Sequence, residues 1–191
     1  MTLEIKGNWN KGFAYDYHIT NSIFLGYDDN NHAMFDNSRS AMGELVYQLK
    51  YRNDTTKVSF ITELLLNEYS GWESFDYIIP APSSKQRVNQ PVVLISQDLS
   101  NRINVPCLQA LYKDYSCNNK LIKEMDNKGD KLALLRETIK LSNSNLILGK
   151  DILLIDDLFR SGATLEVSTE ILLNNGARSV CVLAMTKTKR D

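Results

Sequence analysis

The sequence predicts a single α/β domain in which helices flank a mainly parallel sheet. The main observation is a continuous apolar run at residues 152–155, typical of a central parallel strand covered on both faces. A helical pattern follows from Thr164, and an apolar strand at 179–184 completes a βαβ unit. A second such strand, 76–79, precedes a helix that begins at Pro91. The 191 residues, 43% of them hydrophobic, suit one core, so we expect the whole chain to form one domain.

The N-terminal part predicts a small β-structure followed by two helices. Aromatic and polar residues alternate within residues 9–35, and the run of Asp and Asn at 28–31 is typical of a hairpin turn. We therefore expect residues 1–36 to form a hood or flap against the sheet edge, with His18 and His32 on its surface. Apolar residues then recur at helical spacing from Ser40 and again over residues 57–69.

The middle of the chain alternates shorter elements with one long polar segment. Residues 105–111 and 138–141 predict strands, and 132–136 predict a short helix. Residues 113–130 are lysine-bearing and lack a periodic pattern. A segment of this length in a compact domain is usually functional or disordered, and a solvated surface loop is an equal alternative for any single lysine.

Composition excludes several classes of function. Lys and Arg number 22 against 23 Asp and Glu, so a net charge of −1 disfavours non-specific binding to nucleic acid or to an anionic membrane. The start of the chain lacks the apolar core of a signal peptide, and we expect a cytoplasmic protein that does not span a membrane. Three separated cysteines and two histidines give no zinc ribbon and predict no metal site made by the protein alone.

Two adjacent carboxylates, Asp156 and Asp157, follow the central apolar run. Such a pair at the end of a buried strand is best explained by a ligand or solvent, and vicinal hydroxyls are a suitable ligand. The start of the next helix adds unpaired N–H groups, a glycine and two hydroxyls that together suit a phosphate. This phosphate loop consists of Arg160, Ser161, Gly162, Ala163 and Thr164. The alternative is an ordinary strand, turn and helix with a solvated acidic turn.

A second loop of interest follows the predicted strand 76–79. Two prolines restrict its backbone, and hydroxyl and basic side chains follow them, which favours a polyanion as ligand. These side chains belong to Ser83, Ser84, Lys85 and Arg87. Without the acidic pair, the same residues would be interpreted as a solvated basic turn.

The acidic pair followed by Ser-Gly-Ala-Thr resembles the signature of type I phosphoribosyltransferases, and within them the ComF-like group is most similar. This resemblance implies that Asp156 and Asp157 hold the 2′- and 3′-hydroxyls of phosphoribosyl pyrophosphate (PRPP). It implies that the phosphate loop holds the 5′-phosphate, and that Ser83, Ser84, Lys85 and Arg87 face pyrophosphate. Arg160-Ser161 stands where the family often has Thr-Thr, and the usual Arg-Gly-Phe before Asn89-Gln90 is absent.

The resemblance also implies an activity and its partners. We expect transfer of ribose 5-phosphate to an unidentified base or amine with release of pyrophosphate, and Mg²⁺ bound mainly through PRPP. Residues 113–130 occupy the position of the family's mobile catalytic loop, which makes Lys120 a candidate catalytic residue beside Asp156 and Asp157. A homodimer is possible. Lys50 lies in a Lys-Tyr-Arg element similar to ComF-like chains, to which we assign no chemistry. The alternative function is non-catalytic PRPP sensing, or a ComF-like accessory role in DNA uptake.

Overall fold

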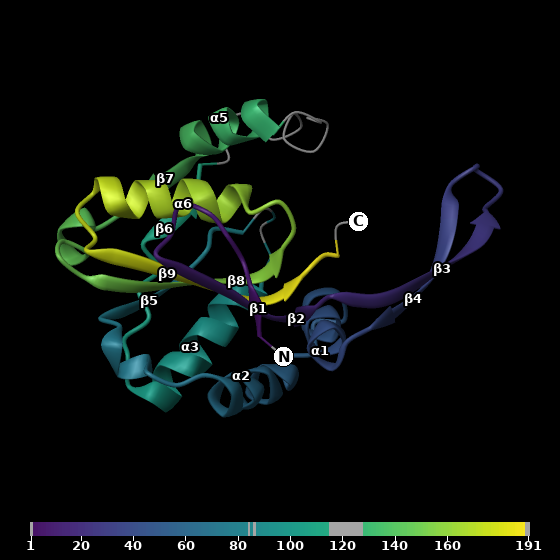
Figure 1. Cartoon of the computed structure of the whole chain (residues 1–191), viewed down its shortest axis with the longest axis horizontal. Coiled ribbons are helices and arrows are strands. Elements are labelled where there is room, and N and C mark those ends of the chain that lie inside the picture. Colours follow the sequence, from purple (N-terminus) through teal and green to yellow (C-terminus); the bar gives the residue numbers. More distant parts are fainter. Residues whose placement is uncertain (1, 84, 86, 115–127, 190–191) are drawn as a thin grey trace.

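The computed structural model describes residues 2–83, 85, 87–114 and 128–189 of the chain. Its centre is a five-stranded sheet of order β1-β2-β9-β8-β5. The strand β1 is antiparallel to β2, and the other neighbours run parallel. Figure 1 shows this sheet between two layers of helices, as the sequence predicted. The strands are β1 Leu3–Glu4, β2 Lys11–Tyr17, β9 Ser179–Lys187, β8 Asp151–Phe159 and β5 Tyr77–Pro80.

The helices divide between the two faces of the sheet. One face carries α1 Ala41–Tyr51, α2 Lys57–Glu68 and α3 Pro91–Ile103, at the bottom of Figure 1. The other face carries α6 Ala163–Asn174, with α5 Lys128–Thr138 packed beyond it. The predicted helices from Ser40, over 57–69, from Pro91 and near Thr164 are confirmed. The described residues also form two 3-10 turns, η1 Trp72–Ser74 and η2 Ser144–Leu146.

The apolar run of β8 explains why both faces need helices. Ile152 and Leu154 lie in the core beneath α6, whereas Leu153 and Ile155 lie in the core beneath α1, α2 and α3. Successive strand residues point to opposite faces, so an unbroken apolar run buries both. All four side chains are at most 4% exposed.

The predicted flap is wrong in its placement. The strand β2 is not a flap element, because it pairs parallel with β9 inside the central sheet. The hairpin itself is confirmed as β3 Ile19–Tyr27 paired with β4 Ala33–Arg39. It projects from the body instead of packing on the sheet edge, as the right side of Figure 1 shows. We call these two strands and their turn, residues 19–39, the arm.

The strand predicted at 105–111 is also wrong. This segment makes one isolated bridge, between Ile78 and Cys107, and the regular strand is β6 Leu111–Lys113. Pro106 lacks an N–H group and so cannot donate within a longer ladder. The strand β6 pairs antiparallel with β7 Ile139–Leu141, close to the predicted 138–141. The helix predicted at 132–136 lies inside the longer α5.

The strand β8 is longer than predicted, which changes the position of the carboxylates. We expected Asp156 and Asp157 to end the strand, but β8 continues to Phe159. The reason is its partner β9, which continues to Lys187 and supplies ladder positions opposite the last residues of β8. Within the described part of the chain, no helix is long and apolar enough to cross a membrane.

Candidate functional site

The carboxylate pair lies in the second half of β8, where the C-terminal end of α1 approaches the sheet. Asp157 forms an ion pair with Lys50, whose Nζ lies 2.8 Å from Oδ2 and 2.9 Å from Oδ1. The two side chains are only 13% and 18% exposed, respectively. Lys50 therefore offsets part of the negative charge that two neighbouring carboxylates bring into a partly buried site.

Asp156 has the most perturbed acidity at this site. Burial, and then the negative charge of Asp157, raise the pKa of Asp156 from 3.8 to about 7. The N–H of Asp157 donates to Asp156 Oδ1 at 2.9 Å, and the charges of Lys50 and Lys113 act in the opposite direction to burial. Lys113 is itself 8% exposed, and burial lowers its pKa. A carboxyl that is partly protonated near neutral pH is typical of functional sites.

His18 joins this cluster, so its prediction as a flap surface residue is wrong. Its Nδ1 lies 3.2 Å from Thr186 Oγ1, and that hydroxyl donates to the backbone oxygen of Asp157 at 3.2 Å. Burial, followed by the positive charges of Arg39 and Lys50, lowers the pKa of His18. The imidazole is therefore neutral over a wider pH range than a free histidine. His32, by contrast, lies exposed on the arm.

The phosphate loop leads from β8 into α6. Gly162 has φ of +77° and is the residue before the helix, which begins at Ala163. A Cβ at position 162 would lie 2.9 Å from the Phe159 ring, so both the backbone angle and the space require glycine. Arg160 is exposed, and Ser161 and Thr164 are partly exposed. The first turn of α6 thus presents N–H groups beside two accessible hydroxyls.

The second loop, residues 81–90, leaves the sheet beside the first. Because β5 and β8 are parallel neighbours, their following loops emerge at the same edge of the sheet. The hydroxyl of Ser83 and the amide of Gln90 both donate to the backbone oxygen of Lys85, at 3.1 and 2.9 Å. The Lys85 side chain is exposed and Arg87 is partly exposed. Ser84 and Lys120, which the sequence also predicted, lie outside the described residues.

The donor set suits a hard cation that takes few ligands from protein. Among the described residues, no three or more His, Cys, Asp and Glu side chains gather as a metal site. Two adjacent carboxylates remain, and Mg²⁺ commonly binds through one or two carboxylates together with substrate phosphates and water. Asp156 and Asp157 therefore fit the Mg²⁺ that the resemblance implies.

Sequence reasoning missed the residues that surround the carboxylates. Lys50 belongs to α1, His18 lies between β2 and β3, and Lys113 belongs to β6, so they meet only in the folded chain. The similarity of Lys50 to the Lys-Tyr-Arg element was the one available signal, and we had assigned it no chemistry. Together these residues make the carboxyl edge of the sheet a compact site of opposite charges.

No protein-family model and no curated protein sequence matches the chain. Solved structures do match. The glutamine PRPP amidotransferase of B. subtilis aligns with a TM-score of 0.54 at 15% identity, over 82% of this chain and 34% of that one. A structure described as the allosteric regulatory enzyme of purine biosynthesis aligns with a TM-score of 0.50 at 16% identity, again over 82% and 34%. The chain therefore spans about a third of the length of these relatives and shares with them a mainly parallel α/β fold.

Proposed function

We propose that the chain binds PRPP and transfers its ribose 5-phosphate group to a base or an amine, releasing pyrophosphate. The observation that carries this proposal is the meeting of three features at one sheet edge. These are the adjacent carboxylates of β8, the glycine-led start of α6 and the basic loop after β5. Vicinal hydroxyls, a phosphate and a pyrophosphate are the three parts of PRPP, so each feature corresponds to one part of the donor.

Each part of this edge has a separate role in the proposal. Asp156 and Asp157 accept hydrogen bonds from the ribose hydroxyls, and the phosphate loop donates its N–H and hydroxyl groups to the 5′-phosphate. Lys85 and Arg87 face pyrophosphate together with Ser83 and Ser84. Lys120 lies outside the described residues and is proposed to approach the pyrophosphate as it leaves.

The reaction is a displacement at C1 of the ribose. A nitrogen of the acceptor forms a bond to C1 and loses its proton to solvent, while the C1–O bond to pyrophosphate breaks and pyrophosphate leaves with the electron pair. Bound Mg²⁺ would supply charge neutralisation for the leaving group. The protein positions the donor and stabilises the charge that develops on the leaving group. These tasks require preorganised groups more than a strong nucleophile. Lys50 serves this purpose because it keeps Asp157 in one orientation.

Binding of PRPP without turnover is the second candidate function. It is favoured by the ion pair between Lys50 and Asp157, since a carboxylate already engaged by a lysine is less available to a ribose hydroxyl. Membership of the ComF-like group, with a role in DNA uptake, is a narrower form of this alternative. The near-neutral net charge disfavours it.

The proposal is tested by incubating the protein with PRPP, Mg²⁺ and a panel of purines, pyrimidines, orotate and amines while pyrophosphate release is followed. Release that depends on one acceptor supports the transferase. Saturable binding of PRPP in calorimetry without release under any acceptor supports the sensor. A protein that neither binds PRPP nor releases pyrophosphate contradicts both functions.

A further inference from the structure

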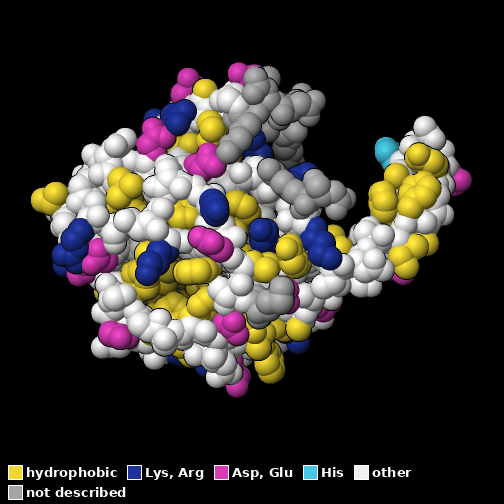
Figure 2. Space-filling model, in the orientation of Figure 1, with side chains coloured by type: hydrophobic (Ala, Val, Ile, Leu, Met, Phe, Trp, Pro, Cys, Tyr) yellow, Lys and Arg dark blue, Asp and Glu magenta, His cyan; other side chains and the backbone are white. Residues whose placement is uncertain are grey.

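The arm carries an apolar surface that nothing in the described part of the chain covers. Figure 2 shows hydrophobic side chains gathered along its outer part, away from the body. Six large hydrophobic residues there are between 42% and 63% exposed: Ile23, Phe24, Leu25, Tyr27, Met34 and Phe35. A contiguous exposed patch of this kind on a soluble domain usually marks an interaction surface.

Both faces of the arm are apolar near its end. Phe24 lies opposite Phe35, with ring centroids 5.6 Å apart, and also contacts Tyr27 at 5.3 Å. Ile23 lies opposite Asp36, one position along the ladder, and therefore points to the other face. An element that is apolar on two faces is suited to insertion between other groups, because packing against a single flat surface would leave one face in water.

The base of the arm makes several contacts with the body, whereas its outer part is exposed. The Ser40 hydroxyl donates to the Tyr17 carbonyl at 2.6 Å and accepts from the N–H of Gly43 at 2.9 Å. The Arg39 guanidinium stacks 3.7 Å from the ring centroid of Tyr47. With these contacts at its base, the arm projects away from its own body, and its apolar residues lie apart from the core (Figure 1).

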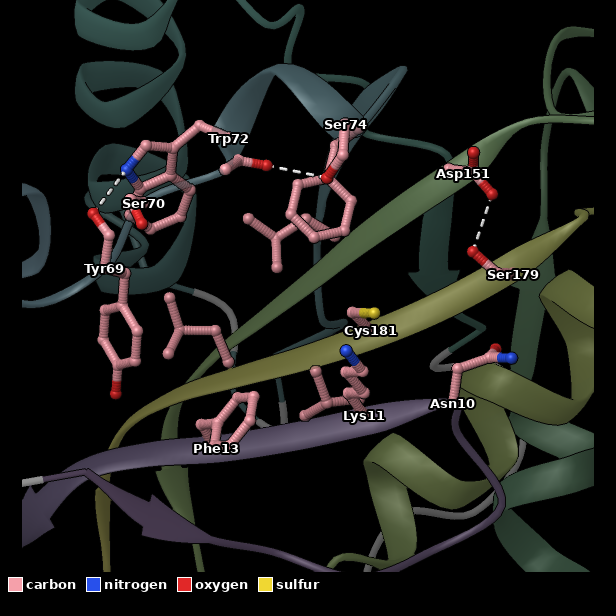
Figure 3. A pocket seen from close by; sticks show the side chains of 15 residues that line it. Asn10, Lys11, Phe13, Tyr69, Ser70, Trp72, Ser74, Asp151, Ser179 and Cys181 are labelled. Carbon is pink, nitrogen blue, oxygen red and sulfur yellow. Dashed lines mark hydrogen bonds between the residues drawn. The ribbon is translucent and has the colours of Figure 1, made fainter.

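The body has an apolar hollow of about 690 Å³ on the face of the sheet that carries α1, α2 and α3. It lies toward the amino ends of β2, β8 and β9, between these strands and η1, and so away from the carboxylate pair. Figure 3 shows Phe13, Tyr69 and Trp72 around it, with Cys181 on its floor. Its size lies within the range of sites that enclose a whole ligand.

Lys11 is a cation that lines this hollow without an ion-pair partner among the described residues. Lys11 lies level with Cys181 in the sheet register and projects beside it in Figure 3. Within residues 2–83, 85, 87–114 and 128–189, Lys11 has no ion-pair partner, whereas Asp151 at the rim is bound by Arg178 and Ser179. The arm carries the complementary charge, because Asp29 and Asp36 are exposed beside its apolar residues and are likewise unpaired in the described residues.

We propose that two copies of this chain exchange arms, so that the arm of each lies in the hollow of the other. The arm supplies apolar side chains and carboxylates, and the hollow supplies an apolar floor and the Lys11 ammonium. Each copy has one arm and one hollow, so reciprocal exchange satisfies both surfaces and closes a two-fold dimer. The occupant is therefore a second copy, and the proposal does not depend on the function of the carboxylate edge.

Sedimentation velocity over a range of protein concentrations tests this proposal. The wild-type chain should give a species of twice its 21.7 kDa mass. Phe24→Ser should weaken dimerisation at least about 30-fold, as expected for an aromatic anchor lost from an interface. Phe60→Ser is the matched control, because Phe60 on α2 is 53% exposed against 51% for Phe24, and this variant should remain dimeric.

A second variant isolates the hollow. Lys11→Glu with Ser70→Trp reverses the charge in the hollow and fills its rim at two exposed positions, so folding should be unaffected. This variant should be monomeric alone. Mixed with Phe24→Ser, it should form a heterodimer, because one intact arm then meets one intact hollow.

Three results would overturn the exchange. One is a wild-type chain that stays monomeric at its highest soluble concentration. Another is a hollow variant that remains dimeric while Phe24→Ser does not, since this would indicate contact between two arms. The third is a series of species larger than the dimer, which would indicate an open chain of copies instead of a closed pair.

Discussion

The two ends of β8 each carry aspartate, and the fold shifts their acidities in opposite directions. At the amino end, the pKa of Asp151 is lowered from 3.8 to about 2 by hydrogen bonds from Arg178 and Ser179. Toward the carboxyl end, burial and the neighbouring Asp157 raise the pKa of Asp156. Both residues are aspartates, five positions apart on one strand, so their surroundings account for the difference between their pKa values.

The two ends of β8 thus differ in their effect on stability: the charge of Asp151 stabilises the fold, whereas the charge of Asp156 destabilises it. Asp151 is surrounded by donors and belongs to a network with Asp76, Lys150 and Arg178 that faces solvent. Asp156 instead sits beside a second carboxylate in a partly buried site, and the folded chain favours its protonated form. A group that makes the folded state less stable is retained most readily where a ligand needs it. This contrast supports our proposal that the carboxyl end of β8 binds the ligand.

The largest expected effect is the loss of the Lys50 charge. Lys50→Met leaves Asp157 without its cation beside Asp156, and breaking a mostly buried pair in this way should destabilise the fold by about 3 kcal/mol. Lys150→Met is the control at the amino end. Its Nζ lies 3.0 Å from Asp76, but these two side chains are 41% and 30% exposed. That variant should lose less than about 1 kcal/mol in urea unfolding. Equal losses would remove the distinction between the two ends.

Glycines at either end of β8 give the next largest contrast. Gly162→Ala combines an unfavourable φ of +77° with a Cβ that meets Phe159, and should cost about 2 kcal/mol and weaken binding of ribose 5-phosphate. Gly149→Ala has φ of +69° and open space, so it should cost about 1 kcal/mol and leave binding unchanged. Thermal unfolding and calorimetry measure the two effects. Unchanged binding in the Gly162 variant would place the phosphate elsewhere.

A smaller effect of opposite sign is expected when the Asp156 carboxyl is made neutral. Asp156→Asn should stabilise the fold at pH 8 by on the order of 1 to 2 kcal/mol, because it removes a carboxylate that burial disfavours. The folded pKa of Asp156 exceeds its unfolded value, so its stabilising contribution is present below pH 4 and lost as pH rises toward 7. The advantage of the variant should therefore grow from pH 4 to pH 7 and then level off.

Urea unfolding across this pH range provides the measurement. The lowered pKa of His18 acts in the opposite direction, since a neutral histidine favours the folded state as pH rises. This contribution is common to the wild type and the variant, and it cancels in their difference. A difference independent of pH would show that Asp156 titrates normally.

The smallest effect belongs to the amino end. Asp151→Asn removes a carboxylate with a lowered pKa, whose stabilising contribution is present above pH 4 and lost as pH falls toward 2. The network is solvent-facing, so the loss at pH 7 should be less than about 1 kcal/mol. Opposite signs for Asp151→Asn and Asp156→Asn in the same unfolding assay would confirm the contrast, and equal signs would contradict it.

Local patterns predicted the elements of this fold well, because they depend on residues close in sequence. The apolar run of β8, the Pro91 that starts α3 and the helix that follows Gly162 are all encoded within a few residues. The pairing of β2 with β9 was missed, since residues 11–17 alternate like an antiparallel hairpin and only their distant partner shows otherwise. The strand predicted across Pro106 was wrong because the apolar pattern does not take into account that proline lacks the backbone N–H group needed for a ladder.

The candidate site was predicted in part for the same reason. Asp156, Asp157 and the phosphate loop lie within nine consecutive residues, so their motif is visible in the sequence. The partners of Asp156 and Asp157 come from residues 18, 50 and 113, and no local pattern brings these together. The raised pKa of Asp156 depends on burial beside Asp157 and was equally inaccessible before the fold was known.

Calorimetric titration of PRPP with Mg²⁺ into three proteins tests the central claim most directly. The wild type and Asp151→Asn should bind with the same affinity, whereas Asp156→Asn should bind about ten- to hundredfold more weakly, as expected when one charge-assisted hydrogen bond is lost. Both variants replace aspartate by asparagine on the same strand, so any difference in affinity is caused by the position of the residue. A wild type that does not bind PRPP, or two variants weakened equally, would contradict the assignment of the donor to the carboxyl end of β8.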